Sequence, residues 1–310
     1  MENEDPHKSI LEEIEIGVGT SAWGDRYMWN YGKSYTYADI EQVFNASLEA
    51  GINFFDTAEV YGQGRSEQLI GGLAQNAGKP VLIATKYFPY PWRLSPKVLQ
   101  KVLQNSLTRL NMDQVFLYQI HWPFSVLPVE SLMSALAESV RSGKTLLVGV
   151  SNYSKSQIQR ALKALTRSGI SLASNQVEYN LLNRQIEKNG LLARCQELGI
   201  RVIAYSPLAQ GMLTGKYSPE SPPPGMRGPR YAGLLKEIQP LLALMADIGK
   251  GHGDKTLSQV ALNWLICKGT LPIPGAKTLA QVQNNNGSVG WRLTEEEVFA
   301  LDKASEELGK

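Results

Sequence analysis

Short runs of apolar and β-branched residues recur along the chain, separated by longer amphipathic stretches. Near-continuous apolar runs that alternate with helical patterns are typical of parallel strands buried on both faces. We therefore interpret each run as one strand of a parallel sheet. The runs fall at residues 14–20, 53–57, 81–86, 115–121, 145–151, 174–180, 201–207 and 270–276.

The stretches between these runs predict helices. Residues 37–51, 95–111 and 257–269 carry apolar side chains at intervals of three and four residues. Eight strand–helix units in about 250 residues are typical of a (β/α)8 barrel. No Gly/Ser linker divides the chain, so we expect a single barrel domain over residues 1–310, with an N-terminal closing segment. A further helix within 291–308, capped at Thr294, would close the barrel or its mouth.

Ionisable residues end three consecutive predicted strands, at the position where barrel enzymes place their chemistry. These residues are Asp56, Lys86 and His121. Each has an ordinary alternative, since an aspartate can cap a helix, a lysine can extend to solvent and a histidine can pack in a core. All three in register on neighbouring strands favour an active site.

Tyr61 stands five positions after Asp56, in the stretch FFDTAEVYG. A tyrosine has a pKa near 10 and is a poor acid at neutral pH. We expect the Lys86 ammonium, held by Asp56, to stabilise the phenolate and lower the pKa of Tyr61. His121 would add a hydrogen bond to the same substrate oxygen. The set predicts reduction of a carbonyl group, which requires a nicotinamide cofactor because no side chain supplies hydride.

The cofactor signal differs from the usual dinucleotide-binding fingerprint. The stretch GVGTSAWG lacks the third glycine of G-x-G-x-x-G, and no acid follows about 20 residues later. Near the chain's end, Gly275 precedes a helix start whose N–H groups suit a phosphate. Lys277 and Gln281 lie four residues apart on this helix, and the charge of Lys277 favours NADPH over NADH. The alternative is a capped surface helix with a solvated lysine.

Composition narrows the function classes further. The chain has 31 Lys+Arg and 29 Asp+Glu, giving +2 without a basic stripe, so nucleic-acid binding is not predicted. No apolar run approaches the roughly 20 residues that span a bilayer. Cys195 and Cys267 lie far apart, which favours a reducing compartment. We expect a cytoplasmic monomer or weak homo-oligomer. Location in the plastid stroma is the alternative if a transit peptide was removed.

Several motifs resemble those of the aldo-keto reductase superfamily, over essentially the whole chain. They are FFDTAEVYG, IATK, IHWP, GVSNY, NQVEYN, YSPLAQGMLTGKY and IPGAK…QVQNN. GMLTGKY and His121-Trp122-Pro123 are similar to the branch with potassium-channel β-subunits and with bacterial and plant plastid reductases. The resemblance implies NADPH as cofactor and a catalytic tetrad of Asp56, Tyr61, Lys86 and His121.

The resemblance also implies where the cofactor lies. Ser151, Asn152 and Gln176 would bind the carboxamide, and Tyr205 would stack on the nicotinamide ring. Further expected contacts are Thr20, Ser21, Asp56, Ser206, Pro207, Leu208, Gly211, Leu213, Lys216, Gly275, Lys277, Gln281 and Asn285.

Two features depart from the family pattern. Many relatives carry Glu where this chain has Asn284, which weakens one adenine contact. The Pro-rich segment 217–231 is long, and it leaves open whether Arg227 and Arg230 bind phosphate or belong to a surface loop.

Aromatic residues gather in or near the predicted strand-end loops and predict an apolar pocket. They are Trp23, Tyr27, Trp29, Trp92, Trp122 and Phe124, of which we select Trp23, Trp92 and Trp122 as pocket residues. Such a pocket suits planar or apolar aldehydes and ketones, with pyridoxal and methylglyoxal as candidates.

Two other functions share part of this pattern. A cofactor-sensing regulatory subunit would keep the tetrad but turn over negligibly. A metal-dependent hydrolase would need several His and Asp ligands at strand ends, where His121 is the only histidine.

Overall fold

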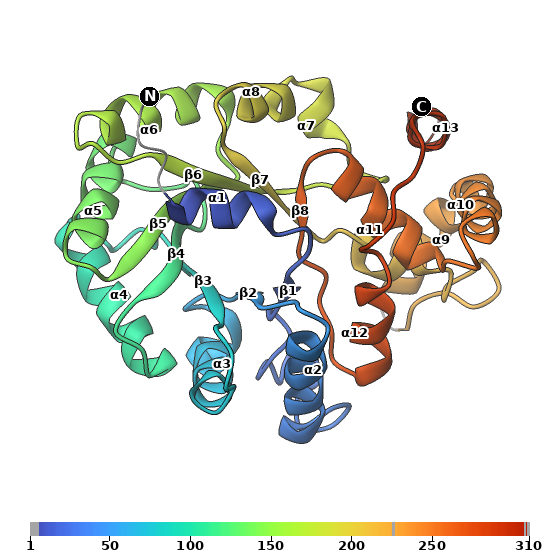
Figure 1. The fold of residues 1–310 in the computed structure, drawn as a ribbon, viewed down its shortest axis with the longest axis horizontal. Coiled ribbons are helices and arrows are strands. Elements are labelled where there is room, and N and C mark those ends of the chain that lie inside the picture. The colour runs from blue at the N-terminus through green and yellow to red at the C-terminus, as the bar shows by residue number, and fades with distance from the viewer. Residues whose placement is uncertain (1–5, 225–226, 307, 309–310) are drawn as a thin grey trace.

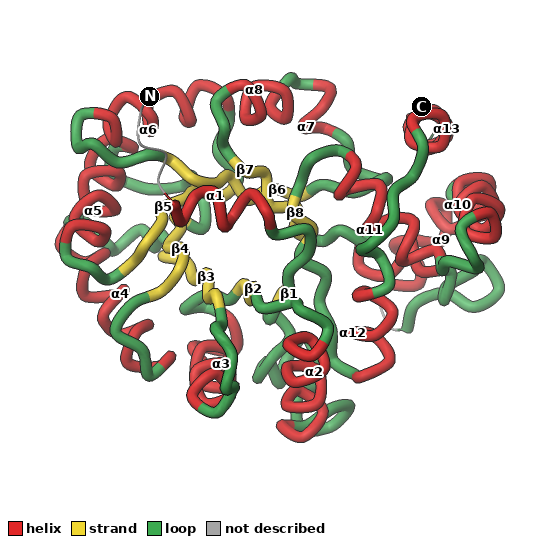
Figure 2. The backbone as a smooth tube through the Cα atoms, in the orientation of Figure 1, coloured by secondary structure: helices red, strands yellow, loops and turns green. Residues whose placement is uncertain are grey.

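Parallel strands form a ring with helices outside it (Figures 1 and 2). The computed structural model describes residues 6–224, 227–306 and 308, and within them eight strands pair in chain order. The ring closes because the backbone N–H groups of Gly17 and Gly19 donate to Pro272 and Pro274, each at 3.0 Å. The predicted (β/α)8 barrel is confirmed. Its strands are β1 (Val18–Gly19), β2 (Phe54–Asp56), β3 (Leu82–Tyr87), β4 (Val115–Ile120), β5 (Thr145–Ser151), β6 (Leu172–Glu178), β7 (Arg201–Tyr205) and β8 (Leu271–Pro272).

The helices begin and end at local sequence signals. Thr36 starts α2 with a capping box, in which its N–H donates to the Asp39 carboxylate at 2.7 Å. Asn111 ends α4 in the left-handed conformation. None of the helices in the described part of the chain has the length and apolar character that a bilayer crossing requires. The α-helices are α1 (Pro6–Glu13), α2 (Tyr37–Glu49), α3 (Arg65–Gln75), α4 (Lys97–Leu110), α5 (Val129–Arg141), α6 (Lys155–Thr166), α7 (Gln185–Lys188), α8 (Leu191–Glu197), α9 (Arg227–Glu237), α10 (Gln239–Gly251), α11 (Leu257–Cys267), α12 (Leu279–Asn286) and α13 (Glu295–Glu306), and the 3₁₀ turns are η1 (Tyr61–Gly64) and η2 (Ala209–Thr214).

Side chains inside the barrel form an apolar layer below a polar one. Helix α1 crosses the N-terminal end of the barrel (Figure 1), and its fully buried Leu11 covers the apolar layer. Because side chains alternate along a strand, the residues two positions onward on β2, β3 and β4 form the next layer, namely Asp56, Lys86 and Gln119. A closing N-terminal segment was predicted, but its helical form was not. The apolar layer includes Phe54, Ala84, Leu117, Leu147, Ala173, Ile203 and Leu271.

Two expectations about the C-terminal half were wrong. Helix α13 starts after its predicted cap, where the Glu297 N–H donates to Thr294 Oγ1 at 3.2 Å. It packs outside the ring against α10 and α11, and therefore closes neither the barrel nor its mouth (Figure 1). Segment 217–231 is not loop throughout, since α9 begins at residue 227. The side chains of Arg227 and Arg230 lie outside the described residues.

Candidate active site

The Lys86 ammonium is the centre of a buried polar cluster at the C-terminal ends of β2 and β3. Its Nζ donates to the Asp56 carboxylate, to the Thr57 carbonyl at 2.8 Å and to the Tyr61 hydroxyl at 3.4 Å. The Lys86 side chain is 0% exposed and that of Asp56 is 2% exposed. The structure thus brings Lys86 together with Asp56 and Tyr61, which the sequence selected from a different segment.

The second oxygen of the Asp56 carboxylate has its own donors, which a buried ion pair needs to offset lost hydration. Gln176 Nε2 donates to it at 2.8 Å and Gln119 Nε2 at 3.4 Å. Gly149 makes room for this layer, because a Cβ there would stand 2.2 Å from Ser174 Oγ. Sequence reasoning missed Gln119, although a polar residue inside the apolar run of β4 was a visible signal.

Tyr61 lies in the turn η1, where Gly62 and Gln63 have left-handed backbone (φ 54° and 59°). Burial raises the pKa of the Tyr61 hydroxyl, and the Lys86 ammonium lowers it by less, so the net pKa is raised. Lys86 thus lowers the pKa of Tyr61 as expected, but the sequence did not reveal that burial raises it by more. Tyr61 is protonated at neutral pH, as a proton donor must be.

The His121 ring packs edge-on against Tyr61 and Phe88, with both ring centres 5.6 Å away. Burial, with a smaller effect of the Lys86 ammonium, lowers its pKa to about 3. Among the described residues, no group pairs with the buried Nδ1 of His121. An unpaired buried N–H is rarer than an unpaired acceptor, so we assign the proton of the neutral ring to Nε2. His121 can then donate a hydrogen bond but carries no charge.

This pKa predicts how stability depends on pH. Between about pH 3 and 6.5 the unfolded chain binds a proton at His121 that the folded chain does not. The free energy of unfolding should therefore fall by about 1.4 kcal/mol per unit as the pH drops below 6.5. Urea unfolding at pH 4.5, 5.5 and 6.5 should show a steeper fall in the wild type than in His121→Gln, and the difference between the two slopes should be about this size. Parallel curves for the two proteins would refute the assignment.

Residues expected at the nicotinamide gather at the ends of β5, β6 and β7. Ser151 Oγ donates to the Gln176 carbonyl at 2.8 Å, Asn152 Nδ2 donates to Ser151 Oγ at 3.0 Å, and the Tyr205 hydroxyl donates to Asn152 Oδ1 at 3.1 Å. Thr20 differs from its expected role, because its fully buried hydroxyl donates to the Asp56 carbonyl at 2.9 Å. Its side chain fastens the end of β2, while Ser21 beside it is partly exposed.

The loop after β7 has an unusual backbone. Ser206, Ala209 and Gln210 have φ values of 50°, 47° and 55°, the left-handed region that costs free energy for residues with a Cβ. Such strain clusters at functional sites. Asn180 Nδ2 donates to the Ser206 carbonyl at 3.0 Å and holds the loop. The expected pyrophosphate contacts on this loop are Ser206, Pro207, Leu208, Gly211, Leu213 and Lys216, of which Pro207, Gly211 and Leu213 are buried and Lys216 is exposed.

The predicted phosphate end lies at the start of α12. Thr278 caps this helix, and the Lys277 N–H donates to Gln281 Oε1 at 2.8 Å. The Lys277 ammonium lies 5.1 Å from the ring centre of Trp29 and 5.3 Å from that of Tyr35. A helix N-terminus beside an ammonium fits a phosphate group.

Other residues at this end are placed as follows. Asn285 is buried on the same helix, and Gly275 is exposed in a bridge to Gly19, which closes the barrel. Asn284 Oδ1 accepts a bond from the Thr256 hydroxyl at 2.7 Å, so this departure from the family pattern ties α12 to the start of α11.

Some of the aromatic residues selected from the sequence pack in the core, and others lie at the mouth of the barrel. Trp23 is 0% exposed and its Nε1 donates to the Ala276 carbonyl at 3.0 Å, so it packs in the core and its selection as a pocket residue was wrong. Trp92 is 71% exposed and stacks on Tyr90 with ring centres 4.5 Å apart. Trp122 stacks on Phe124 at 5.5 Å. Two stacked pairs therefore stand near His121.

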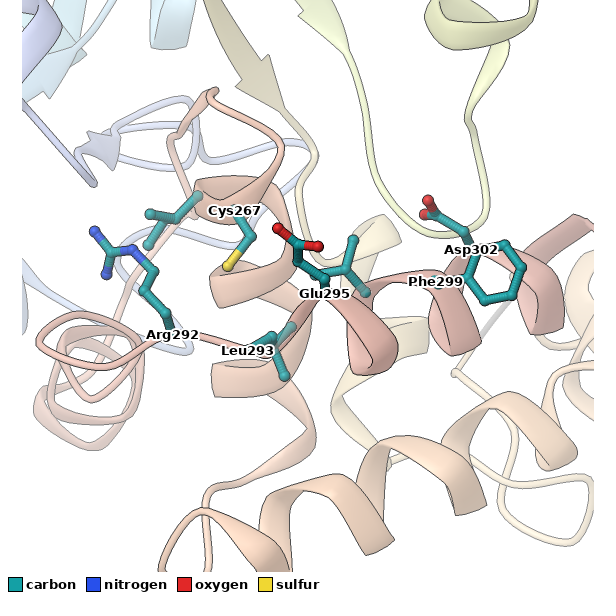
Figure 3. A pocket seen from close by; sticks show the side chains of 8 residues that line it. Cys267, Arg292, Leu293, Glu295, Phe299 and Asp302 are labelled. Carbon is teal, nitrogen blue, oxygen red and sulfur yellow. The ribbon is translucent and has the colours of Figure 1, made fainter.

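A groove between α11 and α13 lies outside the ring (Figure 3). Cys267, Arg292 and Phe299 are among its lining residues. It contains no member of the predicted tetrad, so we do not assign the chemistry to it.

Known proteins match the chain over nearly its full length. The model of the aldo/keto reductase family matches residues 15–306. The chain belongs to the aldo/keto reductase family. It is 41% identical, over 97% of its length and 85% of the relative's, to a protein of Arabidopsis thaliana named "Pyridoxal reductase, chloroplastic". The predicted family and the enzyme class of oxidoreductase are thus confirmed.

Solved structures of family members have the same fold. A glycerol dehydrogenase from Gluconobacter oxydans superposes with a TM-score of 0.82, at 27% identity, covering 96% of this chain and 93% of that one. An aldo-keto reductase from Klebsiella pneumoniae, solved in complex with NADPH, gives a TM-score of 0.74 at 28% identity, covering 93% and 90%.

Proposed function

We propose that this aldo-keto reductase uses NADPH to reduce an aldehyde or ketone to an alcohol, with Tyr61 as the proton donor. The observation that carries the proposal is the buried Lys86 ammonium, which contacts both the Asp56 carboxylate and the Tyr61 hydroxyl. A partly buried hydroxyl held by an ammonium is suited to giving up its proton during a reaction, because the anion left behind is stabilised at once.

Each member of the tetrad has a distinct part in this mechanism. The bound nicotinamide would supply hydride to the carbonyl carbon. As the carbonyl oxygen gains negative charge it becomes a far stronger base than a phenolate, so the raised pKa of Tyr61 does not prevent transfer of its proton. Lys86 then neutralises the phenolate, and Asp56 keeps Lys86 in place. The neutral His121 donates a hydrogen bond that directs the carbonyl oxygen.

The preference for NADPH rests on Lys277 at the start of α12. A 2′-phosphate there would gain a charge-assisted hydrogen bond, which contributes about 1.5 to 3 kcal/mol. We expect Lys277→Ala to raise the KM for NADPH by about tenfold or more and to leave the KM for NADH within about twofold. Lys250→Ala, at a 70% exposed position on α10, is the control. An equal loss for both cofactors would contradict the assignment.

The substrate class follows from the mouth of the barrel. The stacked pairs Tyr90–Trp92 and Trp122–Phe124 offer flat apolar surfaces near His121. Such surfaces favour planar or apolar carbonyl compounds over polar ones. Pyridoxal is a planar aromatic aldehyde, and the name of the Arabidopsis relative supports it as a candidate.

The test is steady-state oxidation of NADPH, and separately of NADH, with 4-nitrobenzaldehyde, methylglyoxal and pyridoxal. The proposal expects turnover with NADPH that is faster for the aromatic aldehydes. Tight NADPH binding without turnover on any of the three would reject the reductase and favour a cofactor-sensing subunit.

A further inference from the structure

A largely buried ion pair beside the active site has no part in the mechanism described above. Arg93 Nη1 and Nη2 donate to the two carboxylate oxygens of Glu59 at 2.6 and 2.9 Å. The side chains are only 14% and 10% exposed. Glu59 stands two residues before Tyr61, and Arg93 belongs to the loop between β3 and α4. The pair therefore ties together two loops at the C-terminal end of the barrel.

The same two side chains also hold the start of the second loop. The Phe88 N–H donates to Glu59 Oε1 at 2.7 Å, and Arg93 Nη1 donates to the Phe88 carbonyl at 2.8 Å. The guanidinium carbon of Arg93 lies 4.8 Å from the Tyr87 ring centre and 5.0 Å from that of Tyr90. Bidentate pairing and cation–π contacts fix both the position and the orientation of this loop.

The loop carries an aromatic column that runs from the catalytic histidine to solvent. The Phe88 ring meets His121 edge-on at 5.6 Å, Tyr90 follows Phe88 at 4.6 Å, and Trp92 stacks on Tyr90 at 4.5 Å with an interplanar angle of 12°. Trp92 is 71% exposed at the outer end. The column is thus a continuous aromatic surface next to the reacting groups, and its base is held by the ion pair.

We propose that Glu59 and Arg93 are positioning residues that clamp the column of Phe88, Tyr90 and Trp92 as a wall of the substrate site, and that this wall selects carbonyl compounds bearing a planar aromatic group. The inference rests on the proposed reductase function and adds the residues that order the surface on which its substrate preference depends. A wall that is ordered beforehand does not have to be ordered when substrate binds. Loss of the clamp therefore penalises only substrates large enough to use the wall.

Arg93→Met tests this directly, because it removes the ion pair and the bond to the Phe88 carbonyl. We expect the KM for 4-nitrobenzaldehyde to rise by about tenfold, the KM for methylglyoxal to stay within about twofold, and kcat to change less than KM. Glu59→Gln keeps an acceptor for the Phe88 N–H, so it should show a smaller rise of about threefold. An equal rise in KM for both aldehydes would overturn the proposal.

A matched control is available in the Glu67–Arg109 ion pair, which joins α3 to α4 with side chains 0% and 25% exposed. Glu67→Gln should weaken an ion pair that is remote from the column, and so should leave the ratio of the two KM values unchanged. A changed ratio in this control would show that loss of any buried ion pair alters selectivity, and would also overturn the proposal.

Two further measurements do not depend on turnover. Hydrogen exchange of residues 88–93 in the cofactor-free protein should be faster in Arg93→Met than in the wild type, and unchanged exchange would refute the clamp. The affinity of the NADP⁺-loaded protein for 4-nitrobenzaldehyde should weaken by about tenfold in Arg93→Met. If that loss occurs in a protein that never turns over, the proposed reductase function fails while the clamp stands. If affinity is unchanged, the clamp fails while the reductase function stands.

Discussion

We expect Tyr61→Phe to lower kcat/KM for carbonyl reduction by about 10²- to 10⁴-fold, the range that general acid catalysis supplies. The phenyl ring can keep the edge-on contact with His121, but the hydroxyl group that contacts Lys86 and carries the proton is removed. Affinity for NADPH, measured by titration calorimetry, should stay within about twofold, because none of the expected cofactor contacts is removed.

Tyr118→Phe is the control for this substitution. Tyr118 lies on β4 and is 0% exposed, and its hydroxyl has no partner among the described residues. Removing an unpaired buried hydroxyl should leave both turnover and stability nearly unchanged or raise stability slightly. If Tyr61→Phe retains reduction within a few fold of the wild type, another group donates the proton and the assignment is wrong.

The barrel was predictable from sequence because its signal is repeated. Each buried strand is a short apolar run, and each run is followed by a stretch with helical spacing of apolar residues. A wrong boundary in one unit therefore does not change the number of strand–helix units. Helix α1 was not predictable in this way, since it buries Leu11 across the end of the barrel rather than within the repeat. The position of α13 depends on contacts such as that between Trp264 and Asp302, 38 residues apart in the chain.

The catalytic groups were predictable from their place at strand ends, but their electrostatics were not. The direction in which Lys86 acts on Tyr61 follows from charge alone, whereas the net pKa depends on how far the hydroxyl is buried. Likewise, an aromatic residue near a strand end does not reveal which way it faces. Trp23 and Trp92 have the same chemistry, yet one is 0% exposed in the core and the other 71% exposed at the mouth.

Substitutions in the Asp56–Lys86 pair should affect both the stability of the fold and the rate of reduction. We expect Lys86→Met to lower the free energy of unfolding by about 3 to 5 kcal/mol, because it leaves the carboxylate of Asp56 buried without its counter-charge. It should also abolish reduction, since the phenolate of Tyr61 loses its neutralising ammonium. Urea unfolding and NADPH oxidation measure the two effects on the same protein.

The double variant Asp56→Asn/Lys86→Met decides between a structural and a catalytic reason for the ion pair. Replacing both members of a buried pair by neutral groups is often neutral or stabilising. Gln176 can still donate to the amide oxygen that the Asp56→Asn substitution leaves in place of the carboxylate oxygen. We therefore expect most of the lost stability to return while reduction stays absent. Recovery of both would mean that the pair only shapes the fold. Recovery of neither would mean that the double variant does not pack. It would contradict the view that the apolar layer supplies the stability of the barrel and that a neutral pair can replace the ion pair above it.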